Sequence, residues 1–247
     1  MQIALSTDSL KGYGLNRIFE IAKATGFDGI DLAMDKKDLD TLDKDYVAKL
    51  SKDYGLPVFA IQTFDNAKQS DLEESIEMAK EVGARVIIVQ APKILDHKYA
   101  SWLKKEVPNI RKKEEISIAL ENAPNKTWLG FIPERVMNNL NELRKFKHAC
   151  LDTSRVAEKK EDLMFVYGTL QKFLVHVHLS NFARNKGYQP LTKGSLPLES
   201  FLSKLANDNF KGAVSIKISP KYMQVRDMEK LERNLKDSID FVKKYAK

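Results

Sequence analysis

Cysteine is almost absent from this 247-residue chain, which contains Cys150 alone. A disulfide within the chain is therefore excluded, and such a composition is typical of proteins in a reducing compartment. The sequence also lacks an apolar stretch long enough to cross a membrane, and Met1–Leu10 has the pattern of an opening strand rather than of a signal peptide. We therefore expect a cytoplasmic protein without a membrane-spanning segment.

An excess of acidic residues is also absent. The 41 Lys and Arg residues against 34 Asp and Glu residues give a formal net charge of +7 and a pI of about 9.2. This balance favours anionic partners, including phosphorylated metabolites and nucleic acid. However, the basic residues are scattered over the expected helices, without the regularly interleaved aromatic residues that a nucleic-acid groove needs. We expect a solvated basic surface and a small-molecule partner, with the oligomeric state left open.

What the chain does contain is a repeat of short apolar runs, each ending in a polar side chain. The polar ends stand at positions 6, 31, 62, 90, 121, 152, 178 and 217, so successive ends are 25 to 39 residues apart. A βαβ unit takes roughly 30 residues, and eight such units close a barrel of about 250 residues. The repeat predicts an α/β protein with a single (β/α)8 TIM barrel, forming one domain over residues 1–247. The runs are Ile3–Ser6, Gly29–Asp31, Val58–Gln62, Val86–Gln90, Ile116–Glu121, Ala149–Asp152, Val175–His178 and Val214–Lys217.

The helices between these runs are marked by their ends. Three helical stripes stop at Gly26, Gly55 and Gly83, each just before a strand, where glycine supplies the left-handed turn that ends a helix. Ser70 and Glu73 have the spacing of a capping box and predict the start of the third helix. The later helices are expected around residues 97–107, 133–146, 156–172, 197–207 and 222–246.

Alternation within the late strands predicts which way their polar ends point. In the run 175–180, His176 and His178 share the face opposite the bulky aliphatic residues. Because β-branched residues suit packing beneath helices, the polar set should face the barrel axis. The polar ends should then meet at the mouth where the strands end, which is where active sites of such barrels lie. The residues expected to converge there are Glu121, Asp152, His178 and Lys217.

Two carboxylates and an imidazole on adjacent strands can supply three facial ligands to zinc, manganese or magnesium. A metal bound to a hydroxyl and a carbonyl oxygen would acidify the intervening C–H bond, and a nearby carboxylate or amine would move the proton. Each residue also has a plainer interpretation, since an inward Asp or Glu can simply form a salt bridge with Lys217.

Several motifs occur in the order found in one superfamily. They are Gly26-Phe27-Asp28-Gly29-Ile30-Asp31-Leu32, Ala119-Leu120-Glu121-Asn122, Leu151-Asp152-Thr153, His176-Val177-His178-Leu179-Ser180, and Tyr188-Gln189-Pro190-Leu191 through Gly194. Together they resemble the xylose isomerase-like barrel superfamily, which includes sugar isomerases and epimerases, dehydratases and endonuclease IV. The resemblance runs from about residue 2 to residue 245.

The resemblance implies a metal held by Glu121, Asp152 and His178. It also identifies two departures. Where the family has a fourth ligand, a glutamate, this chain has Lys217, whose ammonium group has no lone pair to donate. Where many relatives have a histidine three residues after the aspartate, it has Arg155. Ordinary two-base epimerisation and a three-zinc nuclease are both disfavoured by these departures.

Two states of the site stay open. In the first, Glu121, Asp152 and His178 hold a divalent metal, and Glu121 or Lys217 moves the proton of a sugar or sugar-phosphate isomerase, epimerase or related lyase. In the second, Lys217 replaces the metal charge by pairing with Glu121 and Asp152. That barrel would bind a polyol or anionic metabolite without turnover, or would act as a Lys-dependent lyase.

An endonuclease IV-like DNA-binding protein is a third hypothesis for the function. Residues expected to contact a substrate are Asp31, Gln62, Gln90, Asn122 and Arg184.

Overall fold

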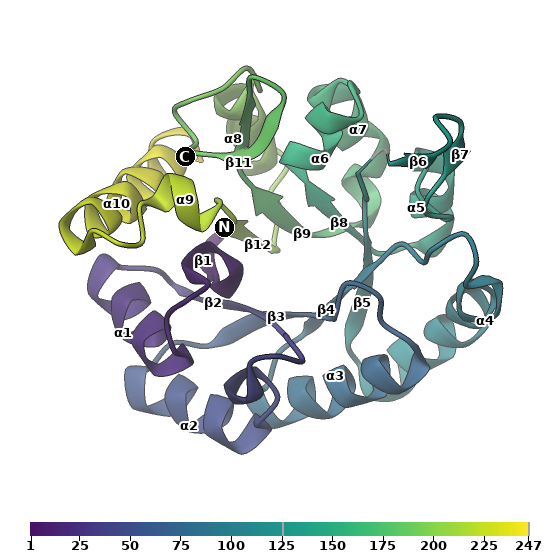
Figure 1. Ribbon diagram of the computed structural model, residues 1–247, viewed down its shortest axis with the longest axis horizontal. Helices are drawn as coiled ribbons and strands as arrows, with labels where there is room; N and C mark the ends of the chain where they lie inside the picture. The colour runs from purple at the N-terminus through teal and green to yellow at the C-terminus, as the bar shows by residue number, and fades with distance from the viewer. Residues whose placement is uncertain (125, 247) are drawn as a thin grey trace.

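The computed structural model describes residues 1–124 and 126–246. Eight parallel strands of this part of the chain close into a barrel, and helices surround it (Figure 1). The order around the barrel is β1-β12-β9-β8-β5-β4-β3-β2, and the pairing of Gln2 with Ala213 closes the circle. The (β/α)8 TIM barrel predicted from the repeat is therefore confirmed. The strands are β1 (Gln2–Ser6), β2 (Gly29–Ala33), β3 (Val58–Gln62), β4 (Val86–Gln90), β5 (Ser117–Glu121), β8 (Ala149–Asp152), β9 (Leu174–Leu179) and β12 (Ala213–Ile216).

The helices pack their apolar faces onto the outside of the barrel. Fully buried side chains such as Phe19, Leu72 and Phe201 meet the outward aliphatic residues of the strands. The helices are α1 (Leu15–Thr25), α2 (Lys44–Tyr54), α3 (Gln69–Val82), α4 (His97–Glu114), α5 (Leu140–Phe146), α6 (Thr153–Glu158), α7 (Leu163–Leu170), α8 (Leu198–Asn207), α9 (Pro220–Met223) and α10 (Met228–Tyr245). None of the described helices combines the length and the apolar character needed to span a bilayer.

Short elements decorate the mouth, at the carboxyl ends of the strands. The 3₁₀ helix η1 (Thr7–Leu10) follows β1 directly. A further 3₁₀ turn at this end is η2 (Leu39–Thr41), and two hairpins are formed by β6 (Thr127–Trp128) with β7 (Ile132–Pro133) and by β10 (Asn181–Ala183) with β11 (Lys186–Gln189). The 3₁₀ turn η3 (Gln171–Phe173) instead directly precedes β9, at the opposite end of the barrel.

The glycine-terminated helices are confirmed, since α1, α2 and α3 end at Gly26, Gly55 and Gly83 in the left-handed conformation. The prediction of a capping box formed by Ser70 and Glu73 is wrong. Helix α3 begins one residue before Ser70, at Gln69, and the carboxylate of Asp71 accepts a hydrogen bond from the backbone N–H of Lys68 at 2.7 Å.

Several later helix boundaries also differ from the prediction. The helix expected over 156–172 is two helices, because the carboxylate of Asp162 accepts the N–H of Phe165 and starts α7. The helix expected over 133–146 begins only at Leu140, where Asn139 caps it, and the last one is divided into α9 and α10. Helix α4 extends beyond 107 and runs through Pro108 to Glu114.

Gly29 at the start of β2 has no room for a side chain. An added Cβ would lie 2.5 Å from both the carbonyl oxygen of Pro57 and the ring of Phe59. Because backbone cannot yield easily, we expect Gly29→Ala to lower the free energy of unfolding by about 1–3 kcal/mol in urea denaturation. The matched control is Gly168→Ala in helix α7, where nothing lies within 4 Å. This control should raise stability by about 0.5–1 kcal/mol, and a Gly29→Ala protein as stable as the wild type would contradict the packing.

Candidate active site

His178 shows that the polar faces of the strands point into the barrel. Its Nδ1 lies 2.5 Å from Oε1 of Glu121 on β5, and its Nε2 lies 2.8 Å from Oδ2 of Asp31 on β2. Strand β9 is separated from β2 by β12 and β1, so these side chains meet only across the interior. His176 lies two residues before His178 on the same face of β9, and its Nε2 lies 2.8 Å from the hydroxyl oxygen of Ser215. The predicted inward phase of the late strands is thus what the structure shows.

Arg155 lies between the two carboxylates that were expected to hold a metal. It belongs to the first turn of α6, and Asp152 caps that helix by accepting the backbone N–H of Arg155 at 3.1 Å. The guanidinium Nη1 donates to Oε2 of Glu121 and, at 3.1 Å, to the backbone carbonyl of Asn122. Its Nε donates to the hydroxyl of Tyr188 at 3.1 Å and lies 3.5 Å from Oδ2 of Asp152. The planar fork of an arginine suits this bridging of two carboxylates.

Lys217 lies beside this cluster without joining it. Its Nζ donates to Oε1 of Gln62 at 2.5 Å and lies 3.5 Å from Oδ2 of Asp8. The expected salt bridges of Lys217 with Glu121 and Asp152 are not among the ion pairs of the described residues, because Arg155 occupies that place. The lysine side chain is only 7% exposed.

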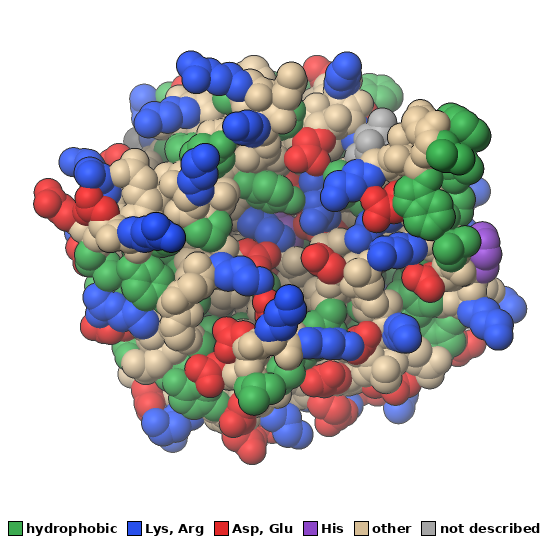
Figure 2. Space-filling view, in the orientation of Figure 1, with side chains coloured by type: hydrophobic (Ala, Val, Ile, Leu, Met, Phe, Trp, Pro, Cys, Tyr) green, Lys and Arg blue, Asp and Glu red, His purple; other side chains and the backbone are tan. Residues whose placement is uncertain are grey.

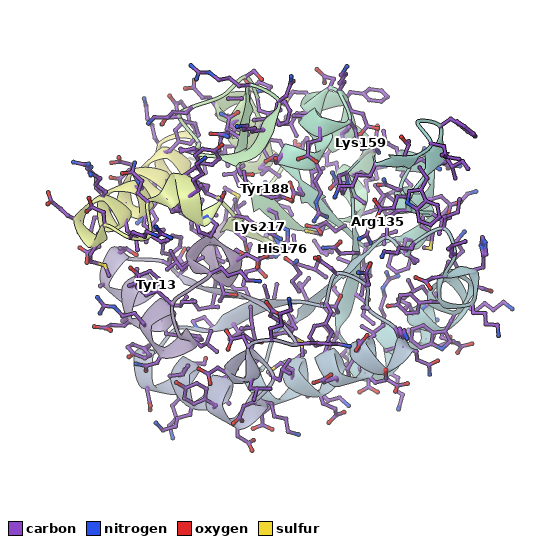
Figure 3. The ribbon with its side chains drawn as sticks, viewed as in Figure 1. Tyr13, Arg135, Lys159, His176, Tyr188 and Lys217 are labelled. Carbon is purple, nitrogen blue, oxygen red and sulfur yellow. The ribbon has the colours of Figure 1, made fainter. Side chains whose placement is uncertain are left out.

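A chamber of about 320 Å³ opens above these residues at the barrel mouth. A volume of this size suits a small metabolite. The mouth is hollowed in Figure 2, and Figure 3 shows Tyr188, Lys217 and His176 near its centre. The residues that line the chamber are Asp8, Gln62, Asp65, Gln90, Arg155, Tyr188, Lys217, Ile218, Ser219 and Pro220. Its polar wall therefore presents two cations, two amides and two carboxylates to a ligand.

The buried ionisable groups stabilise one another in their charged forms. Burial raises the pKa of Glu121, but the charges of Arg155, Lys217 and His178 outweigh it and hold that pKa far below its usual value. Burial lowers the pKa of His178, yet Cys150 and then the carboxylates of Asp31 and Glu121 outweigh burial and leave that pKa well above its usual value.

The same balance keeps Lys217 charged. Burial lowers its pKa, but Glu121 and then Asp8 outweigh burial, so that the pKa is raised above the ordinary lysine value. An ammonium group that holds its proton so firmly is a hydrogen-bond donor and a source of positive charge. It is poorly suited to serve as a neutral base or as a Schiff-base nucleophile, both of which need the free amine.

The expected metal ligands do not fit a divalent cation as they are arranged. Both oxygens of Glu121 are engaged, by His178 and by the cation Arg155. The oxygens of Asp152 accept from the backbone of Arg155 and from the hydroxyl of Tyr188. Among the described residues, ligand atoms within 4.8 Å of one another are found in two other groups, Asp31 with His176 and His178, and Glu121 with Cys150 and His178. Asp152 belongs to neither, and the guanidinium of Arg155 already lies against both carboxylates and offsets one of their two negative charges.

The residues predicted to contact substrate fall into two sets. Gln62 and Gln90 line the chamber. Asp31 is buried beneath His178, and Asn122 is locked to the backbone of Asp152, accepting its N–H at 2.7 Å. Arg184 lies in the β10–β11 hairpin and lines a separate groove with Lys186 and Lys193. The structure therefore places the predicted Gln62 and Gln90 at the chamber and the other three elsewhere.

Four ionisable residues that line the chamber, Asp8, Asp65, Arg155 and Tyr188, were not predicted as site residues from the sequence. Arg155 stood out only as a departure from the family pattern, and Tyr188 only as part of a motif that carries the resemblance. Their contacts depend on side-chain direction, which no spacing reveals. Asp8 follows the polar end of the first strand by two residues, and Asp65 follows the third by three. A search extended a few residues beyond each strand end would have found both.

Comparison with known proteins agrees with the barrel fold. The family model for the xylose isomerase-like TIM barrel matches residues 19–245. The chain belongs to this family. Curated proteins similar to this xylose isomerase-like barrel include the uncharacterized protein ML2432 of Mycobacterium leprae, at 23% identity over 276 residues, 99% of this chain and 98% of that protein. The uncharacterized protein Rv0498 of Mycobacterium tuberculosis is 22% identical over 278 residues, covering 98% of this chain and 97% of that protein.

Solved structures similar to this xylose isomerase-like barrel include two sugar epimerases. The apo 3-keto-D-glucoside 4-epimerase YcjR of E. coli superposes with a TM-score of 0.75 and 20% identity, over 99% of each chain. D-psicose 3-epimerase of Clostridium cellulolyticum H10, solved with D-tagatose, gives a TM-score of 0.74 and 12% identity over 100% of each chain. At these identities the likeness establishes the shared fold.

Proposed function

We propose that this chain is an isomerase or epimerase-like enzyme that moves a proton next to the carbonyl of a small sugar-like substrate. We further propose that Arg155 and Lys217 supply the positive charge at the mouth, in place of a divalent metal. The position of Arg155 carries this proposal, because its guanidinium bridges the carboxylates of Glu121 and Asp152 while it lines the chamber. The second cation, Lys217, lines the same chamber.

The chamber chemistry suits an oxygen-rich ligand. The amides of Gln62 and Gln90 offer donors and acceptors to hydroxyl groups, as a polyol needs. The ammonium of Lys217 can donate to a carbonyl oxygen and stabilise the negative charge that develops there when a neighbouring C–H bond breaks. The sugar epimerases among the similar structures support a substrate of this class.

Glu121 takes a different role from the catalytic one expected of it. It is fully buried, it does not line the chamber, and both its oxygens are held. We infer that Glu121 orients Arg155 and His178 rather than touching substrate.

Exchange of carbon-bound hydrogen tests this function without knowledge of the natural substrate. A panel of aldoses and ketoses, with and without a phosphate group, is incubated with the protein in D₂O and EDTA, and the C–H signal beside the carbonyl is followed by NMR. We expect at least one sugar to lose this signal, at the same rate with and without the chelator. Exchange that stops in EDTA and returns with manganese would contradict the metal-free site. Binding of a sugar without any exchange would favour the alternative of a barrel that binds but does not turn over.

A further inference from the structure

We propose that Asp8 is the base that removes the proton, and that it works as a pair with Lys217, which holds the substrate oxygen. This inference rests on the proposed function and names the residue that the proposed reaction still lacks. Asp8 belongs to η1, directly after β1, whereas the carboxylates that the family resemblance singles out lie on later strands.

Access to the chamber separates Asp8 from the other carboxylates of the mouth. Glu121, Asp31 and Asp152 have side chains that are at most 1% exposed, and none of them lines the chamber. The side chain of Asp8 is 38% exposed and does line it.

Asp65 is the other carboxylate that lines the chamber. Its Oδ1 accepts the side-chain amide of Gln90 at 2.9 Å. Asp8 contacts Lys217 through Oδ2 alone, at 3.5 Å, and Oδ1 has no hydrogen-bond partner among the described residues. Oδ2 of Asp65 also has no hydrogen-bond partner among the described residues, but Asp8 is the one of the two that pairs with Lys217, so its free Oδ1 lies beside the ammonium group that would hold the substrate oxygen.

The pair is held rigidly by the residue next to Asp8. The hydroxyl of Ser9 donates to the carbonyl of Ile216 at 3.1 Å and accepts the N–H of Ile218 at 3.0 Å. These two backbone groups flank Lys217 on either side, so one buried serine fixes η1 against the residue that carries the ammonium group. The backbone N–H of Lys217 in turn donates to the carbonyl of Leu179 at 3.0 Å. Such support from neighbouring hydrogen bonds is what a proton-transfer pair requires.

The step balances without an oxidant or a further reactant. Asp8 takes the proton from the carbon beside the carbonyl, and the electrons of that C–H bond form a carbon–carbon double bond. The carbonyl π electrons move onto oxygen, where the ammonium of Lys217 donates a hydrogen bond or a proton. Asp8, whose side chain is 38% exposed, exchanges its proton with solvent and delivers a proton to the former carbonyl carbon. The hydroxyl on the carbon that lost its hydrogen gives its proton to Lys217, which replaces the one given to the former carbonyl oxygen, and the carbonyl re-forms on that carbon.

A single base on one face of the substrate favours a particular outcome. It can deliver the proton to the adjacent carbon on the same face, which converts an aldose to a ketose. Inversion at one carbon requires a proton from the opposite face. We therefore infer that this site carries out aldose–ketose isomerisation rather than epimerisation.

The test uses Asp8→Asn, with Asp35→Asn as the matched control. Asp35 also pairs with a lysine at the rim, Lys11 at 2.6 Å, but does not line the chamber. In the D₂O assay, Asp8→Asn should slow exchange by about 100-fold or more while retaining sugar binding within a few-fold. Asp35→Asn should exchange like the wild type. Asp8→Ser is a second variant that also removes the carboxylate, and it should slow exchange to a similar extent. Thermal unfolding of both variants is measured in parallel to show that each is folded.

The outcomes separate this inference from the function on which it rests. If the wild type exchanges no member of the panel, both are overturned. If the wild type exchanges and Asp8→Asn retains its rate within a few-fold, the assignment of Asp8 alone is overturned. A product with inverted configuration at the exchanged carbon would overturn the single-base isomerisation, whereas deuterium at the neighbouring carbon of the isomer would support it.

Discussion

Replacing Arg155 with methionine is expected to lower the free energy of unfolding by about 3–5 kcal/mol, because it removes the cation from a largely buried ion pair. Glu121 and Asp152 would then remain in the interior as carboxylates with 0% exposed side chains and no guanidinium between them. Urea denaturation measures the change. A loss below about 1 kcal/mol, which is typical of an exposed pair, would contradict the buried bridge.

Two further variants separate charge from packing. Arg111 is also partly buried, but its guanidinium donates to the backbone carbonyls of Ile118 and Phe146 rather than to carboxylates. Arg111→Met should therefore be clearly less destabilising than Arg155→Met. Adding Glu121→Gln to Arg155→Met should restore part of the lost stability, because it removes one of the uncompensated charges. The coupling expected between such neighbours is about 0.5–3 kcal/mol.

Replacing Lys217 with methionine is expected to slow hydrogen exchange by about 100- to 1,000-fold, the usual effect of removing a donor to a developing oxyanion. Methionine keeps much of the apolar volume but leaves no hydrogen bond to the substrate oxygen. The rate is measured by the loss of the C–H signal in D₂O, at saturating sugar, so that weaker binding does not mask the chemical step.

Lys159→Met is the control for Lys217→Met. Lys159 is comparably buried, with a side chain that is 10% exposed, and it donates to the carbonyl of Asn138 at 2.8 Å. It does not line the chamber, so this variant should keep the wild-type rate. A Lys217→Met protein that exchanges within a few-fold of the wild type would contradict the role given to the ammonium group.

The fold was largely predictable because the signal for it is repeated. Three of the strands, Val58–Gln62, Val86–Gln90 and Ala149–Asp152, have the bounds that the apolar runs predict, and the others differ by one or two residues. Helix ends were harder, because Asp162 looks like a solvent-facing charge inside one long helical pattern until its carboxylate is seen to cap α7.

The site was predictable in position and less so in its contacts. Alternation correctly predicts that Glu121 and His178 face one another inside the barrel, and the departures at Lys217 and Arg155 are visible in the sequence. Whether Arg155 or Lys217 pairs with Glu121 and Asp152 depends on the direction in which helix α6 starts after β8. Arg155 lies in the first turn of a helix capped by Asp152, and its side chain reaches back to the carboxylates of Glu121 and Asp152, whereas Lys217 extends toward Gln62 and Asp8. Periodicity contains no information of this kind.

The claim that a guanidinium replaces the metal is tested most directly by a metal titration. Protein freed of metal with EDTA is titrated with Mn²⁺ and with Zn²⁺, and the bound metal is measured by mass spectrometry after dialysis. A variant that combines Arg155→His with Lys217→Glu replaces both cations with metal-binding side chains and serves as the positive control. We predict that the wild type retains far less than about one equivalent, and that the double variant retains about one. A wild type that holds a full equivalent, and loses it on His178→Ala, would contradict the account.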